Sequence, residues 1–104
     1  MTKLMIKFQN IPCAILEELE KNHHYRLTYL KEYSGSGISL TLPVQDTPYE
    51  FESFPAFFDG LLPEGIQLEA LLRQKKIDHN DCMAQLAAVG EDLVGAVTVS
   101  EIPQ

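Results

Sequence analysis

Histidine, a frequent catalytic residue and metal ligand, occurs only three times in this sequence of 104 residues. His23 and His24 are adjacent, and neighbouring side chains on a strand or a turn point apart. The pair therefore cannot easily chelate one metal ion, and we expect it to be exposed in a loop. His79 is expected in a loop that caps a helix, with no evident acidic partner. The sequence predicts no metal site.

The two cysteines, Cys13 and Cys82, fall in segments that we expect to be a strand and a helix. Neither belongs to a CxxC pair or to a Cys/His spacing typical of zinc sites. Both are interpreted as small buried hydrophobic residues of a protein from a reducing compartment. No disulfide is predicted.

The motifs of common enzyme classes are absent from the sequence. There is no GxSxG, HExxH or Walker A motif, and no kinase-type Lys, Asp and Asn set for ATP and magnesium. Gly35-Ser36-Gly37 is a fragment of a phosphate-binding loop and is better explained as a flexible turn. Glu17, Glu18 and Glu20 are interpreted as a solvated face. We therefore expect a protein that is not an enzyme, with no catalytic residue and no cofactor.

The formal net charge of −7 is unevenly distributed along the chain. Residues 1–45 hold five Lys/Arg and four Asp/Glu, whereas residues 46–104 hold three and eleven. A surface this acidic repels phosphate backbones, which argues against direct nucleic-acid binding. It could meet a basic partner or serve only solubility, and the composition does not decide between these roles. Residues 1–6 are too short an apolar run for a signal peptide, and no run is long enough to span a membrane, so a cytoplasmic location is expected.

The rest of the chain is organised around residues 54–66, which combine three Phe, two Leu, two Pro and two Gly. Ser53 suits the N-cap of a short helix that begins at Phe54 and ends at Gly60. Pro63 and Glu64 suit the first turn of a second helix. The pattern predicts two helices joined by a rigid corner.

The residues of this corner are expected to divide between two roles. Phe54, Phe57, Phe58 and Leu61 are expected to serve the core of the domain. The corner itself could pack on the same core or contact another protein, because an exposed apolar tip is a candidate anchor. The candidate partner-contact residues are Leu62, Pro63, Glu64, Gly65 and Ile66.

Alternating apolar residues predict strands over 4–8, 11–16 and 25–29, with a tight turn at Gln9-Asn10. Such short, closely linked strands favour an antiparallel meander. A further extended segment is expected over 38–42.

Three more elements complete the expected fold. Leu68, Leu71 and Leu72 form a predicted core stripe on the second helix. A third helix capped by Asp78 or Asn80 is expected to bury Met83, Leu86 and Ala87 and to stop at Gly90. The β-branched segment Gly95–Val99 predicts a closing strand beside the N-terminal hairpin. The expected fold is α+β: a small antiparallel sheet with about three short helices on one side.

Three motifs, Ile38–Pro43, Phe57–Gly65 and Val89–Thr98, occur in an order and at a spacing that resemble a known family. The sequence resembles the N-terminal subdomain of HipA-type serine/threonine kinases, the toxins of bacterial toxin–antitoxin modules. The resemblance covers essentially the whole chain, 1–104, as a single domain. One departure is Gly60, where the family more often has Asn.

A full HipA continues into a kinase domain, whereas this sequence stops after the predicted closing strand. We expect a gene that encodes only this subdomain rather than a truncated piece. Such a chain is similar to the small HipS-like protein of split HipBST systems. The resemblance implies a non-catalytic antitoxin that binds and neutralises a HipA-like (HipT-type) kinase, where the subdomain sits in full-length HipA.

The same resemblance leaves other roles open. A ternary complex with a helix-turn-helix, HipB-type DNA-binding subunit is implied, without direct nucleic-acid or membrane contact by this chain. The chain could instead be an accessory module that completes the kinase fold, or bridges it to that subunit, without inhibition. An enzyme with an unrecognised site is the third, weaker alternative.

Overall fold

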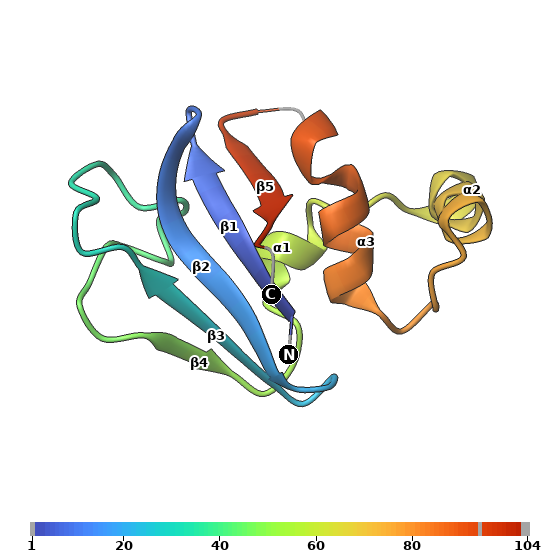
Figure 1. Ribbon diagram of the computed structural model, residues 1–104, viewed down its shortest axis with the longest axis horizontal. Helices are drawn as coiled ribbons and strands as arrows, with labels where there is room; N and C mark the ends of the chain where they lie inside the picture. Colours follow the sequence, from blue (N-terminus) through green and yellow to red (C-terminus); the bar gives the residue numbers. More distant parts are fainter. Residues whose placement is uncertain (1, 94, 103–104) are drawn as a thin grey trace.

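The computed structural model describes residues 2–93 and 95–102, and its architecture is the expected α+β fold (Figure 1). The strands are β1 (Thr2–Phe8), β2 (Ile11–Glu20), β3 (His24–Tyr29), β4 (Tyr49–Phe51) and β5 (Val97–Glu101). The helices are α1 (Ala56–Asp59), α2 (Gly65–Lys75) and α3 (Cys82–Val89), followed by the 3₁₀ turn η1 (Gly90–Asp92). The five strands form one antiparallel sheet in the order β4-β3-β2-β1-β5.

The N-terminal hairpin forms as the sequence predicts. Gln9 and Asn10 have φ values of 51° and 67°, so both central residues of the two-residue turn are left-handed. This geometry matches the twist of the flanking strands, which is why such turns dominate tight hairpins. Leu4 lies opposite Leu16, so both strands present their apolar side chains to the same face of the sheet.

The interpretation of Glu17, Glu18 and Glu20 as a solvated face is wrong for Glu18. β2 continues to Glu20, and the Glu18 side chain is only 8% exposed. A Glu18 carboxylate oxygen accepts a hydrogen bond from the Asn22 backbone N–H at 3.2 Å. Asn22 has a φ of 63°, so this bond stabilises the tight turn into β3. Glu18 therefore has a structural role at the end of a long strand.

Residues 38–42 do not form the expected strand. They make a tight turn with a single bridge between Ser39 and Leu42, which leaves Leu40 fully exposed and Ile38 and Leu42 buried. β4, which the sequence did not predict, instead supplies the edge strand beside β3. Three consecutive residues are too few to show an alternating pattern.

The closing strand lies where it was expected, with β5 antiparallel to β1 and Val99 opposite Ile6. Val97 and Val99 point into the core, at 8% and 1% exposure. Gly90 packs so closely on β5 that a Cβ there would overlap the carbonyl oxygen of Val99. Glycine at this position therefore allows the end of α3 to approach the sheet.

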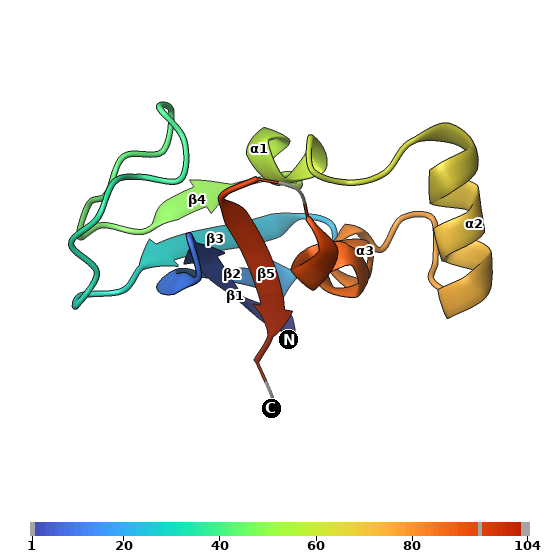
Figure 2. The same cartoon turned by 90° about the horizontal axis from the view of Figure 1, so that it is seen from above.

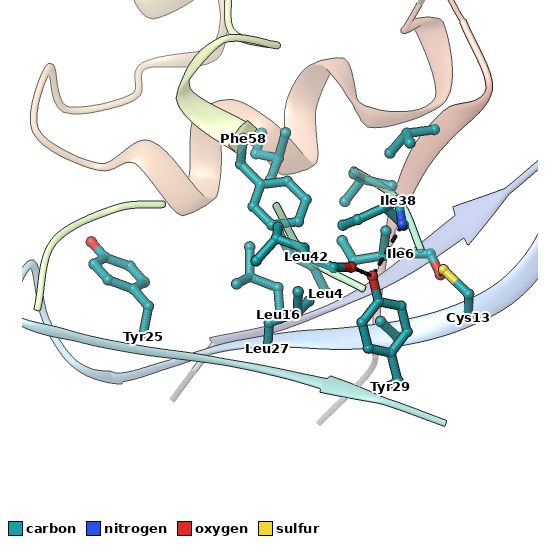
Figure 3. Packing of buried hydrophobic residues seen from close by; sticks show 14 of the residues in the cluster. Leu4, Ile6, Cys13, Leu16, Tyr25, Leu27, Tyr29, Ile38, Leu42 and Phe58 are labelled. Atoms are coloured by element: carbon teal, nitrogen blue, oxygen red, sulfur yellow. Dashed lines mark hydrogen bonds between the residues drawn. The ribbon is translucent and has the colours of Figure 1, made fainter. Parts of the chain in front are cut away.

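The core lies between one face of the sheet and the helices α1 and α3 (Figure 3). Phe58 from α1 and Met83 and Leu86 from α3 are fully buried against the sheet residues. The sheet contributes its inward-facing positions: Leu4, Ile6, Ala14, Leu16, Tyr25, Leu27, Tyr29, Val97 and Val99. This confirms Met83 and Leu86 as core residues, whereas Ala87 is only half-buried.

The cap of α3 differs from both predicted residues. Asp81 is the N-cap, and its carboxylate accepts a hydrogen bond from the Ala84 N–H at 3.1 Å. Gln85 is buried and donates to the backbone oxygens of Asp78 and His79. These hydrogen bonds from the buried Gln85 side chain therefore hold the loop before α3 against the helix. Gly90 caps the helix C-terminus, as expected.

Helix α2 is placed differently from the predicted core helix (Figure 2). It contains no buried residue and contributes nothing to the core cluster, although it touches α3. Figure 2 shows it standing apart from the sheet, at the opposite end of the molecule from the loop of residues 30–48. The predicted core stripe of Leu68, Leu71 and Leu72 is therefore wrong: these side chains are half-buried and lie outside the core.

Candidate interaction surface

The segment 54–66 serves the core with its first half. Phe58 is fully buried, and its ring meets that of Phe57 edge to face, with centroids 5.2 Å apart. Phe54 packs edge to face on Tyr25 of β3, at 5.5 Å. Phe54, Phe57 and Leu61 are partly buried against the core cluster. The four residues expected to serve the core therefore do so, with Phe58 as the centre.

The first helix of this segment is shorter than predicted. It begins at Ala56 with Pro55 as the N-cap residue, and Ser53 makes no cap hydrogen bond to it. The ψ of 134° at Pro55 is extended, so the helix cannot include Phe54. Gly60 follows the helix as its C-cap in the right-handed helical region. Because that region suits any residue, this glycine is not required by the backbone.

The exposure of the corner residues increases along the chain from Leu62 to Ile66. Leu62 and Pro63 are half-buried, and Leu62 still packs against the core cluster. Glu64 and Gly65 are exposed, and the Ile66 side chain is 84% exposed. The predicted partner-contact residues therefore run from an anchored base at Leu62 to a free apolar tip at Ile66.

The backbone conformation fixes the direction of this tip. α2 begins at Gly65, with Glu64 as its extended N-cap residue, so Pro63 lies before the helix rather than in it. Gly65 has a φ of +59°, which side-chain-bearing residues adopt only at a cost. A Cβ at Gly65 would meet nothing within 4 Å. The requirement for glycine is thus conformational and not steric.

The apolar residues of α2 extend the exposed corner. Leu68, Leu71 and Leu72 follow the tip at helical spacing and are half-buried. At its C-terminus, Lys76 adopts a left-handed conformation and ends the helix, while Arg73 and Lys75 suit the negative end of its dipole. The corner and α2 together present an apolar surface that the domain's own core leaves unused.

Acidic side chains accompany the corner. Asp59 and Glu64 are both exposed near its two ends. On the sheet, Glu50 accepts hydrogen bonds from Arg26 at 2.8 Å and pairs with His24 at 2.6 Å. Hydrogen bonding to His24, and then to Arg26, lowers the pKa of the Glu50 carboxyl. These cations are already engaged by Glu50, whereas the acids of the corner form no ion pair among the described residues.

The cysteines are free, as expected. The Cys13 thiol is buried and donates to the Ile6 carbonyl at 3.3 Å, and burial raises its pKa to about 11. Cys82 is half-buried rather than buried, and burial, with neighbouring carboxylates adding, raises its pKa also. Both thiols are held protonated at neutral pH, which disfavours nucleophilic chemistry.

The histidines do not converge on a site. His23 is exposed in the turn before β3, His24 lies on β3 beside Glu50, and His79 is exposed in the loop before α3. Within residues 2–93 and 95–102, no group of three or more His, Cys, Asp or Glu side chains is placed to hold a metal ion. In the same residues, no helix is long and apolar enough to cross a bilayer.

A second exposed apolar region was not singled out from the sequence. Ile11, Leu40 and Val44 are 57%, 102% and 40% exposed, and they lie in the β1–β2 hairpin and the loop after β3. The sequence placed both Ile11 and Leu40 in segments expected to be extended, over 11–16 and 38–42, without predicting their exposure. The structure leaves both outside the core.

The fold and these surfaces define a small α+β domain with exposed apolar side chains on its corner and in the loop after β3. The model of the HipA N-terminal domain family matches residues 4–100, and the chain belongs to this family. The family takes its name from the N-terminal domain of HipA and not from its catalytic kinase domain. This confirms the resemblance inferred from the three sequence motifs.

The chain is also similar to two individual proteins. A protein of Haemophilus influenzae, described as uncharacterized, is 29% identical over 91 residues, which cover 88% of this chain and 84% of that protein. A solved structure of the N-terminal domain of HipA toxin superposes with a TM-score of 0.76 at 20% identity, covering 100% of this chain and 95% of the other. At that identity the second likeness shows the fold alone.

Proposed function

We propose that this chain is a non-catalytic antitoxin subunit, which binds a HipA-like serine/threonine kinase in the cytoplasm of a bacterium and neutralises it. Family membership supports a role beside such a kinase. The observation that carries the proposal is the corner Leu62–Ile66, where Ile66 is 84% exposed on a backbone fixed by Pro63 and Gly65. A rigid, exposed apolar tip loses little conformational freedom on binding.

Helix α2 supports a partner on this side of the molecule. It has eleven residues, and helices of this length are marginal in water without tertiary packing. Its half-buried leucines lie outside the core, so a bound partner would provide the missing packing. In this proposal the kinase covers the corner first and the leucine face of α2 beside it.

The charge of the surface fits the same partner. In kinases a lysine and metal ions hold the phosphates of ATP, so positive charge gathers at the phosphate site. Asp59 and Glu64 are exposed and precede the apolar tip in the sequence, and in this proposal they would face that site. The corner would enter or cover the active site and exclude the nucleotide or the protein substrate. Steering by charge would speed association more than it strengthens binding.

The proposal is tested by co-expressing the chain with its cognate kinase. The native chain should restore growth, and Ile66→Glu should not, with affinity for the kinase weakened about tenfold or more, as for an interface anchor. Leu40→Glu is the matched control, because Leu40 is just as exposed but lies at the opposite end. Restored growth by a folded Ile66→Glu variant would contradict the role of the corner.

The same experiment separates the alternative function. A chain that binds the kinase but never restores growth would be an accessory module, which completes the kinase or bridges it to a helix-turn-helix DNA-binding subunit. The exposed side chains of Ile11 and Leu40, at the end opposite α2, favour the bridging role because they offer a second contact surface. Kinase activity measured with the purified chain added in vitro decides between inhibition and scaffolding.

A further inference from the structure

A groove of about 480 Å³ is lined by residues of the β1–β2 turn and of the loop after β3. Figure 2 shows that loop at the opposite end of the molecule from α2. The volume of the groove falls within the range typical of ligand sites, about 300–1,000 Å³. It is lined by Phe8, Gln9, Ile11, Pro12, Leu30, Glu32, Tyr33, Ser34, Gly35 and Ser36. None of these residues belongs to the corner or to α2.

The groove exists because β2 extends beyond the end of β3, so the first residues of β2 have no strand beside them on that side. The last pair between these strands joins Ala14 to Tyr29, and Leu30 still donates to the Cys13 carbonyl. The chain then turns away, so Ile11 and Pro12 have no strand partner on the β3 side. Ile11 is 57% exposed as a result, and Pro12 has no N–H to offer an added strand. A ligand here would be recognised through side chains rather than through strand addition.

The opposite wall is built and held in place by tyrosines. The Tyr33 hydroxyl donates to the Ser36 carbonyl at 2.6 Å, and its ring stacks on Tyr29 with centroids 6.2 Å apart. Tyr29 is itself fixed, because its hydroxyl accepts from Ile38 N–H and donates to the Leu42 carbonyl (Figure 3). The wall is therefore formed before any ligand arrives.

Gly35 is part of the same construction. A Cβ at this position would lie 2.5 Å from the Tyr33 hydroxyl oxygen, so a larger residue would require the tyrosine ring to shift. The fragment Gly35-Ser36-Gly37, interpreted from the sequence as a flexible turn, thus shapes one side of a preformed groove. Preformed surfaces bind with a smaller entropic cost.

The chemistry of the lining selects one kind of ligand. Phe8, Ile11 and the Tyr33 ring provide an apolar floor and rim, while Ser34 and Ser36 add polar groups. Glu32 is the one charged side chain among the lining residues, and it is exposed at the edge. An apolar groove with a single carboxylate at its rim complements a large apolar side chain next to a cation.

We propose that this groove binds a segment of a second protein that carries a large apolar side chain beside a lysine or arginine. The exposed rim at Ile11 leaves the groove open, so a chain can cross it instead of ending in it. The site is independent of the corner Leu62–Ile66 and lies at the other end of the molecule. Both surfaces can therefore be occupied at once, and the domain can connect two proteins.

The probe is a pair of random twelve-residue peptide libraries displayed on phage, one with a central Lys and one with a central Glu. Both are selected on the purified full chain. We expect binders from the Lys library, with Leu, Ile, Phe or Met next to the fixed Lys. Their affinity, measured by fluorescence anisotropy, should fall at least tenfold for Ile11→Glu. It should stay within twofold for Ile66→Glu, the matched control outside the groove.

The charge at Glu32 provides the reciprocal test. Glu32→Lys should reverse the preference, so that it selects from the Glu library and binds Lys peptides at least tenfold more weakly. Backbone chemical shifts of the native chain, followed with a selected peptide, should change around Ile11, Glu32 and Tyr33. This second measurement locates the site even where a variant fails to fold.

Several results would overturn the proposal. Binders whose affinity is unchanged in folded Ile11→Glu, or a preference for Lys unchanged in Glu32→Lys, would show that the groove is not the site. Failure of both libraries to yield binders would also contradict it. A concentration-dependent dimer that Ile11→Glu abolishes, seen by sedimentation, would show instead that the groove joins two copies of this chain.

Discussion

Replacing Leu71 in α2 and Leu86 in α3 by alanine tests where the core of this domain ends. Leu86 is fully buried between α3 and the sheet, so Leu86→Ala should lower the free energy of unfolding by about 2–5 kcal/mol. Leu71 is half-buried and lies outside the core cluster. Burying a whole leucine side chain is worth about 1.5–3 kcal/mol, so Leu71→Ala should cost about 1 kcal/mol. The sequence pattern alone placed both leucines in the core.

The assay is urea unfolding followed by far-ultraviolet circular dichroism and tyrosine fluorescence, since the chain has four Tyr and no Trp. The two probes should give coincident transitions with an unchanged denaturant slope in both variants. If Leu71→Ala cost as much as Leu86→Ala, α2 would pack on the core, and the reasoning about its free apolar face would fail. In the kinase-binding assay the order should reverse, with Leu71→Ala the weaker binder among folded variants.

Three further changes follow from individual contacts. Tyr29→Phe removes the hydroxyl that holds the loop 38–42 and should cost about 1–3 kcal/mol in urea unfolding, because two buried backbone groups lose their partner. Gly90→Ala should cost about 1–3 kcal/mol or more, measured as a lower Tm, because its Cβ would overlap the Val99 carbonyl. Burial raises the pKa of Cys13 to about 11 from an ordinary 9, so the folded state holds this proton more tightly. Stability should be complete below pH 9 and fall by about 2–3 kcal/mol as pH rises from 9 to 11, a fall that Cys13→Ala should flatten.

Matched controls sharpen these expectations. Gly60→Asn should leave the Tm nearly unchanged, because Gly60 is right-handed and a Cβ there has only ordinary contacts, 3.5 Å or more away. Equal losses at Gly60 and Gly90 would show that close packing on β5 is not the cause. For Tyr29, the control is Tyr49→Phe, whose hydroxyl bonds the exposed Pro43 carbonyl and should matter less. An alkaline fall of equal size in Cys13→Ala would assign it to other groups, such as Tyr25, whose pKa burial raises to about 12.

The strands that alternate over five or more residues were predictable from the sequence, and so was the placement of the last strand. β1 follows from a period-2 pattern and the Gln9-Asn10 turn from residues that tolerate positive φ, whereas β5 follows from its β-branched residues. The length of β2 did not follow, because Glu18 is acidic in sequence yet buried by its hydrogen bond to the Asn22 backbone. A pattern based on hydrophobicity cannot predict the burial of a polar side chain that has a local hydrogen-bond partner.

Helix α2 shows the complementary failure. Leucines at i, i+3 and i+4 predict an apolar face but not the surface that covers it. The spacing of apolar residues is the same on a helix face that binds another protein as on a face that packs in the core. The corner was predictable for the opposite reason, because Pro63 and Gly65 constrain the backbone locally. The groove at Ile11 was not, since it depends on where β3 ends relative to β2.

The pairing of β5 with β1 has a consequence for how the protein is made. Met5 lies beside Ser100, so β1 is synthesised long before the strand that covers its outer edge. Until residues 97–101 leave the ribosome, that edge presents unpaired backbone groups next to Leu4 and Ile6, a template for pairing with other chains. Contacts so distant in sequence also slow folding. Until β5 is made, the outer edge of β1 is therefore the part of the sheet most open to pairing with other chains.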